Sequence, residues 1–145
     1  MAKSYVKGAS YILYYNSASY GSPTWNIIKA AGDISADFDA DDVEVPERGI
    51  GTGHLKGENN PHFDFTLFED TGDANVVAMI AAVYSGSMVE LAVANGPIAT
   101  TGTKYLRMES KLSGTLNAAR SDVAQYDVVA YRHANSDYDM TRVTV

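Results

Sequence analysis

The sequence predicts an α+β protein that is mainly β, in which antiparallel strands form a β-sandwich or barrel and one helix flanks the sheet. Three observations support this prediction. The chain has 10 tyrosines and 12 glycines, a composition typical of strands joined by turns. Residues 62–70, HFDFTLFED, alternate with a period of two. Residues 73–86 change to a helical pattern, and strand-like segments stand on both sides of it.

Three strands are expected in the first part of the chain. They are residues 8–16 (GASYILYYN), residues 25–30 (WNIIKA) and residues 32–39 (GDISADFD). A turn-rich stretch, SASYGSPT, separates the first two. In the third, Ile34, Ala36 and Phe38 alternate with polar residues, which is the pattern of a half-buried strand.

Residues 40–60 show little regular pattern beyond the short stretch VEV. A segment of this length is long for a connection inside a compact domain, and such segments are usually functional. Five acidic residues lie between Asp37 and Glu44. An EF-hand calcium loop counted from Asp37 requires glycine at the sixth position and glutamate at the twelfth, where Asp42 and Arg48 stand. This excludes an EF-hand but leaves other cation sites and a solvated acidic turn open.

The next strand and the helix are the clearest elements. Phe63, Phe65 and Leu67 share one face of the strand at residues 62–70. In the helix at residues 73–85, Asp73 is placed to cap the first turn and Gly86 to end the last. The apolar stripe expected to pack on the sheet consists of Val76, Val77, Ile80, Val83 and Tyr84.

Four further strands are expected after the helix. They are residues 88–95 (MVELAVAN), 103–114 (TKYLRMESKLSG), 123–133 (VAQYDVVAYRH) and 139–145 (DMTRVTV). A chain of 145 residues suits one domain with a single core, so residues 1–145 are predicted to form one unit.

The composition excludes several functional classes. Hydrophobic residues make up 46% and charged residues 20%, which indicates a globular protein. The net charge of -7 argues against tight binding to nucleic acid or to an anionic membrane surface. Without cysteine there are no disulfides, thiolate zinc sites or cysteine nucleophiles. No membrane-spanning run and no signal peptide are evident, so synthesis in a cytoplasm is expected.

No catalytic constellation is evident either. The histidines His54, His62 and His133 form no HExxH pattern, and each is expected to be a surface or turn residue. The glycine-rich GIGTG at residues 49–53 is not followed by a helix pattern that could bind phosphate. We therefore expect no enzyme activity, no metal ligands and no cofactor. Trp25 and the tyrosines leave open a module that stacks sugars, although strand aromatics more often belong to the core.

Taken in order, several segments resemble a tail tube (major tail) protein of long-tailed bacteriophages. They are TWNIIKA, GDISADFD, the loop with PERGIG, HFDFTLFED, the single helix and SGSMVELAVANG. The resemblance lies in element order and runs from about Gly8 to the end of the chain. It implies a structural virion protein whose hexameric rings stack into a hollow tube. The genome passes through this tube during ejection without specific binding. It also implies a tape measure protein and tail terminator or tip proteins as partners.

The same resemblance implies that residues 40–60 are the long loop that reaches a neighbouring ring. The segment combines acidic, basic and apolar side chains. Burial between subunits on assembly would explain why apolar residues occur there. The contacts between subunits are assigned to Asp41, Asp42, Val43, Glu44, Val45, Glu47, Arg48, Ile50, Leu55 and Lys56. The alternative from another class is a monomeric β-sandwich that binds carbohydrate or another small ligand.

Overall fold

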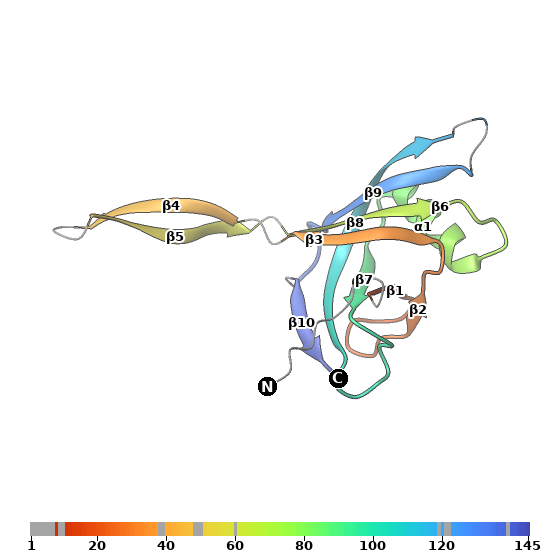
Figure 1. Ribbon diagram of the computed structural model, residues 1–145, viewed down its shortest axis with the longest axis horizontal. Coiled ribbons are helices and arrows are strands. Elements are labelled where there is room, and N and C mark those ends of the chain that lie inside the picture. The colour runs from red at the N-terminus through yellow and green to blue at the C-terminus, as the bar shows by residue number, and fades with distance from the viewer. Residues whose placement is uncertain are drawn as a thin grey trace.

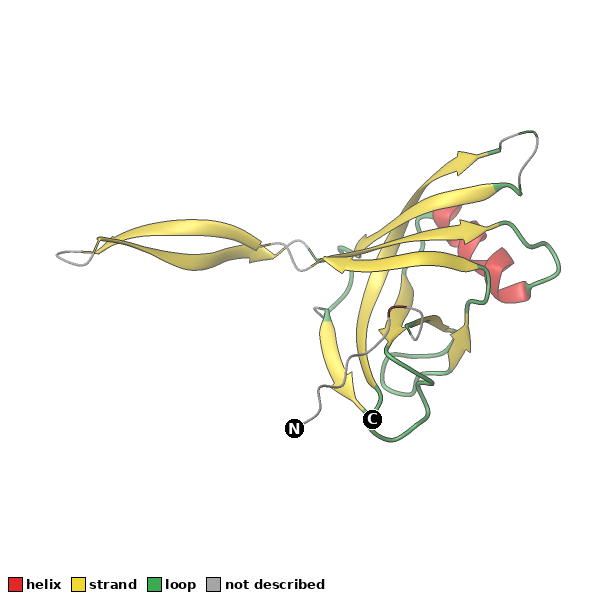
Figure 2. Cartoon of the chain, viewed as in Figure 1, coloured by secondary structure: helices red, strands yellow, loops and turns green. Residues whose placement is uncertain are grey.

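The structure is a curved antiparallel sheet with one helix on it and a separate hairpin that projects from its edge (Figure 1). The computed structural model describes residues 8, 11–37, 40–47, 51–59, 61–118, 120, 123–138 and 140–145. For residues 40–47 and 51–59 it describes the backbone alone. Figure 2 shows how strongly strands dominate and how the helix lies against one side of the sheet.

The main sheet has eight strands in two connected halves. The first half consists of β2 (Trp25–Ile27), β1 (Ile12–Asn16), β7 (Val89–Ala94) and the start of β8 (Lys104–Asn117), in that order. The second half continues through β9 (Gln125–Arg132) and β6 (His62–Phe68) to β3 (Ala31–Asp37). The last strand, β10 (Thr141–Thr144), pairs with the first part of β8.

Strand β8 joins the two halves because it is 14 residues long. It pairs with β7 from Tyr105 to Ser110 and with β9 from Ser110 to Asn117. All pairings are antiparallel, and the end strands β2 and β3 do not pair with each other, so the sheet is open. The predicted mainly β, antiparallel fold with one helix is confirmed, and each of the eight strands expected outside residues 40–60 is present.

The main core lies between the two halves of the sheet and the helix. Phe63, Leu67 and Leu91 are fully or almost fully buried in it, and Leu13 and Met108 join them from the other strands. The period-two pattern of residues 62–70 therefore predicted the buried face of β6 correctly.

The predicted helix forms as α1 (Ala74–Ser85), with its amide at Asn75 donating to the capping carboxylate of Asp73 and Gly86 in the left-handed conformation. Its predicted stripe is partly wrong. Val77 and Tyr84 are 48% and 70% exposed, whereas Met79 and Ala82 are buried beside Val76. At 3.6 residues per turn, Val77 and Tyr84 lie about 80–100° around the helix from Val76, at the margin of the face that packs on the sheet.

The other face of the first half carries a second, smaller core. It is formed by Tyr14, Ala92, Ala94 and Tyr105, and Trp25 packs against it. The Trp25 and Tyr105 rings meet edge to face with 5.8 Å between their centroids. Trp25 is thus a packing residue of the sheet, and β8 is buried on both faces over its first half.

Candidate assembly surfaces

The described residues between 40 and 59 form two strands that pair as a β-hairpin, which the sequence pattern did not predict. Strand β4 (Ala40–Glu47) pairs with β5 (Gly51–Asn59), and neither pairs with another strand of the described chain. Eight residues at roughly 3.3 Å per residue give β4 a length of about 26 Å. The hairpin extends away from the body of the molecule (Figure 1).

The register of the hairpin sorts its residues onto two faces. Val43 lies opposite Leu55, and Val45 lies opposite Gly53. Directly opposed residues in an antiparallel pair share a face, and residues alternate between faces along each strand. One face therefore carries Val43, Val45 and Leu55, whereas the other carries the pairs Asp42–Lys56 and Glu44–His54.

Eight of the predicted contact residues lie on this hairpin. Asp41, Asp42, Val43, Glu44, Val45 and Glu47 are in β4, and Leu55 and Lys56 are in β5. Arg48 and Ile50 lie outside the described residues. The assignment of these ten residues to contacts between subunits stays a prediction.

The base of the hairpin is held by β3 and β6, whose residues Asp37 and His62 are direct register partners. The His62 Nε2 atom lies 3.7 Å from Asp37 Oδ2 and 3.4 Å from Asp64 Oδ2. The His62 side chain is only 15% exposed, and its ring lies beside that of Tyr131. His62 thus begins β6 on the same side of the sheet as Asp64, and its side chain is partly covered there by its neighbours.

A cleft of about 1240 Å³ opens between β3 and the β8–β10 pair. Its floor is apolar and includes Ile34, Leu106 and Met140, which are partly buried and pack against the main core. Lys104 and Arg142 line it as basic residues and Asp33 as an acidic one. At roughly 30 Å³ per water molecule, the space is far larger than a packing defect.

A polar face covers the outer side of the second half of the sheet. The register places Asp64, Asp127 and Lys111 on the side of the sheet opposite the main core, together with Ser35 and Thr115. These residues are exposed or partly exposed, and α1 lies on the opposite face of the sheet. Asp127 accepts a hydrogen bond from the Asn117 side-chain amide. The same register also places Phe68, Val129 and Tyr131 on this side, so the face combines acidic and other polar side chains with a few apolar ones.

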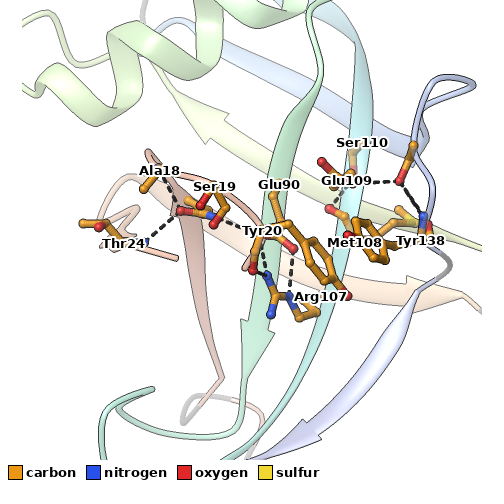
Figure 3. Close-up of polar contacts among 12 residues, drawn as sticks. Ala18, Ser19, Tyr20, Thr24, Glu90, Arg107, Met108, Glu109, Ser110 and Tyr138 are labelled. Carbon is orange, nitrogen blue, oxygen red and sulfur yellow. Dashed lines mark hydrogen bonds and ion pairs between the residues drawn. The ribbon is translucent and has the colours of Figure 1, made fainter. Parts of the chain in front are cut away.

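A buried ion pair was missed by the sequence analysis. Arg107 on β8 donates from Nε to Glu90 Oε2 on β7 at 2.8 Å, and its Nη2 atom donates to Glu90 Oε1 and to the Tyr20 carbonyl (Figure 3). Asn16 donates a further hydrogen bond to Glu90 at 2.7 Å. The signal was available: each strand carries a charged residue inside an apolar run, VELAVA and KYLRM.

The Arg107 guanidinium also anchors a stack of rings. It lies 3.8 Å from the Tyr20 ring centroid, and Tyr20 stacks on Tyr138 at 3.7 Å. Burial opposes the charge on Arg107, but the hydrogen bond and the negative charge of Glu90 outweigh it, so the pKa of Arg107 is raised. The pair thus holds the β1–β2 connection and the segment before β10 onto the sheet.

The described residues offer little for chemistry. Within them, no group of three or more His, Cys, Asp or Glu side chains is placed to hold a metal ion. In the described part of the chain, no helix is long and apolar enough to cross a membrane.

Comparisons of the fold give a consistent picture. A sheath/tube terminator of an extracellular contractile injection system matches with a TM-score of 0.62 and 9% identity, covering 99% of this chain and 100% of that one. The tail of an empty GTA particle, refined with C6 symmetry, matches with a TM-score of 0.58 and 16% identity, covering 96% and 98%. The chain has a tail-tube fold.

A third match comes from another structure of that injection system. The sheath-tube complex of the same injection system aligns with a TM-score of 0.56 and 12% identity over 97% of this chain and 92% of that one. No protein-family model matches the sequence, and no curated protein sequence matches it. The resemblance to tail tube proteins is therefore borne out by the tail-tube fold rather than by sequence.

Proposed function

We propose that the protein is a structural subunit of a phage or phage-like tail, without catalytic activity, that assembles into stacked hexameric rings. One observation carries this proposal: β4 and β5 pair only with each other among the described strands. An isolated two-stranded hairpin is marginally stable in water. A neighbouring ring would supply the contacts that this hairpin does not find within the described chain.

The tail-tube fold supports this proposal over almost the whole chain. The structural relatives are parts of sheath, tube, tail and baseplate assemblies, and the GTA tail was refined with six-fold symmetry. We take six-fold rings as the assembly for this chain on that basis. A tape measure protein and tail terminator or tip proteins would be its further partners in the particle.

The polar face of β3, β6, β9 and β8 is our candidate for the lining of the tube. Asp64 and Asp127 lie on it, and Lys111 adds one positive charge. A lining rich in Lys and Arg would bind DNA phosphates by releasing their counterions, whereas an acidic or neutral one repels them. The face therefore suits the passage of a genome that must not adhere.

Electron microscopy of concentrated, purified protein tests the proposal. Rings or hollow tubes are expected, with tail-initiating partners added if the subunit alone needs nucleation. Duplex DNA at physiological salt should show no gel shift, given the net charge of -7. Protein that sediments as a monomer at all concentrations, with and without such partners, would contradict the proposal.

A second candidate is a monomeric module that binds carbohydrate or another small ligand. It is favoured by the cleft, which Tyr11 and Tyr105 line and whose volume exceeds that of common ligand pockets. A glycan array separates the two candidates, because only the second predicts saturable binding by a monomer.

A further inference from the structure

We propose that Asn95, which precedes Gly96 at the edge of the cleft between β3 and the β8–β10 pair, is a site of spontaneous deamidation. The reaction converts the side-chain amide to a carboxylate and needs only water. It is a chemical property of this part of the fold, so it does not depend on the proposed tail function.

The sequence selects this position, because Asn95–Gly96 is the only Asn–Gly pair in the chain. The backbone nitrogen of Gly96 attacks the side-chain carbonyl carbon of Asn95 and loses its proton. A C–N bond forms, and the side-chain nitrogen leaves as ammonia. Water then opens the resulting succinimide ring at one of its two carbonyls, which gives aspartate or isoaspartate. Glycine favours the attack because it has no Cβ to hinder the approach of its nitrogen.

The structure holds the Asn95 side chain beside the main chain. Strand β7 ends at Ala94, and the Asn95 amide nitrogen donates to the Lys104 carbonyl at 3.0 Å. The Lys104 amide nitrogen donates in return to Asn95 Oδ1, also at 3.0 Å. In a continued antiparallel ladder the backbone carbonyl of Asn95 would take this place. The side-chain carbonyl therefore occupies a backbone position, next to the peptide bond whose nitrogen attacks it.

The same hydrogen bond favours the chemistry. When the Gly96 nitrogen adds to the carbonyl carbon, negative charge develops on Asn95 Oδ1. A backbone N–H group already aimed at such an oxygen stabilises the charge, as the donors of an oxyanion hole do. The Lys104 amide is in this position before the reaction begins. Because attacker and target belong to neighbouring residues, ring closure is also an intramolecular step.

Other asparagines of the described chain lack this combination. Asn16 is only 8% exposed, and its side chain makes hydrogen bonds from both its oxygen and its nitrogen. Asn117 donates to Asp127 and precedes Ala118, whose Cβ hinders attack. Asn95 and Gly96 are partly exposed, so water can reach the succinimide.

Deamidation would change the charge of the cleft. Among its described lining residues, Lys104 and Arg142 are basic and Asp33 is acidic. A carboxylate at position 95 adds a second acid beside Lys104. In the isoaspartate product the main chain also runs through the side chain, which lengthens it by one methylene where β7 leaves the sheet. The cleft of an aged molecule therefore differs in charge and in backbone from that of a new one.

Peptide mass spectrometry of folded protein, incubated in mildly alkaline buffer, tests the proposal. Asn95 should lose its amide at least several-fold faster than Asn16, Asn117 or Asn135, and both aspartate and isoaspartate should appear. A parallel sample in urea gives the rate of the unstructured Asn–Gly pair. If Asn95 keeps its amide in the folded protein while it loses it in urea, the fold protects the site and the proposal is wrong. Earlier deamidation of another asparagine would contradict it as well.

A substitution at the attacking residue sharpens the test. Gly96 does not have a left-handed φ, and an added Cβ would meet only Thr103 Oγ1, at 3.8 Å. Gly96→Ala should therefore leave the fold intact and slow deamidation several-fold. The matched control is Gly21→Ala, where an added Cβ meets nothing within 4 Å. This control should deamidate at the rate of the unmodified protein. If Gly96→Ala deamidates as fast as the control, direct attack by this nitrogen is excluded and the proposal fails.

Discussion

The hairpin β4–β5 and the strands that hold it, β3 and β6, have the same backbone geometry but different support. Phe63, Phe65 and Leu67 of β6 are buried in the main core, and β6 has a partner strand on each side. The hairpin strands have only each other among the described strands. The body therefore finds its supporting contacts within the described chain, and we expect the hairpin to find its own only on assembly.

Removing the hairpin should have the largest effect on assembly and little on folding. Deleting residues 47–56 takes away Glu47 of β4 and most of β5, so β4 loses its partner strand, but it removes no residue of the main core. We expect tube formation to be abolished and the melting temperature of the subunit to change by no more than a few degrees. Electron microscopy and thermal unfolding measure the two effects. A deletion variant that still forms tubes would show that the hairpin is not needed.

A core substitution in the strand next to the hairpin should have the opposite effect. Phe63 is fully buried, so Phe63→Ala should lower the free energy of unfolding by about 3–5 kcal/mol. Urea unfolding of the isolated subunit measures the loss. A loss of less than about 1 kcal/mol would mean that the body is not stabilised by this core in the way described.

Disrupting the buried ion pair should have the next largest effect on the stability of the subunit. Arg107→Met leaves the Glu90 carboxylate buried without its main partner, which should cost about 3 kcal/mol. The double change Arg107→Met with Glu90→Leu should recover part of that loss, because no unpaired charge remains. Urea unfolding of Arg107→Met, of Glu90→Leu and of the double variant makes the comparison. If the double variant loses at least as much stability as the two single changes together, the pair is not coupled as the geometry indicates.

The smallest effect concerns the contact between α1 and β9. The Tyr84 and Tyr126 hydroxyls are 2.9 Å apart, and this hydrogen bond, followed by burial, raises the pKa of Tyr126 from 10.0 to about 12. The fold therefore favours the neutral phenol, and stability should fall as the pH rises from 10 to 12. Tyr84→Phe should flatten that fall. Denaturant unfolding across this pH range checks it, and an unchanged slope would contradict it.

The sequence correctly predicted those elements whose hydrophobic pattern reflects burial within the chain. The alternation at Phe63, Phe65 and Leu67 and the caps at Asp73 and Gly86 gave β6 and α1 correctly. Strand β5 was not predicted because Gly51, Gly53 and Gly57 have low strand propensity. Its residues also show no apolar alternation that would indicate a buried face.

The surfaces could be predicted less well than the elements. The ion pair between Glu90 and Arg107 depends on the register of β7 and β8, which no local pattern specifies. The cleft likewise depends on β3 and β10 lying near each other although they are far apart in the chain. The acidic segment could be selected from its composition alone, and its role in contacts between subunits stays a prediction.

Hydrogen exchange of the β4 and β5 amides in the free subunit and in assembled tubes tests the central claim most directly. A hairpin without further support opens readily, so these amides should exchange quickly in the subunit, while those of β6 and β9 are protected. In tubes, the β4 and β5 amides should become protected to a similar degree as those of β6. Equal exchange of β4 and β5 in both states would show that the hairpin gains no contacts on assembly and would contradict the account.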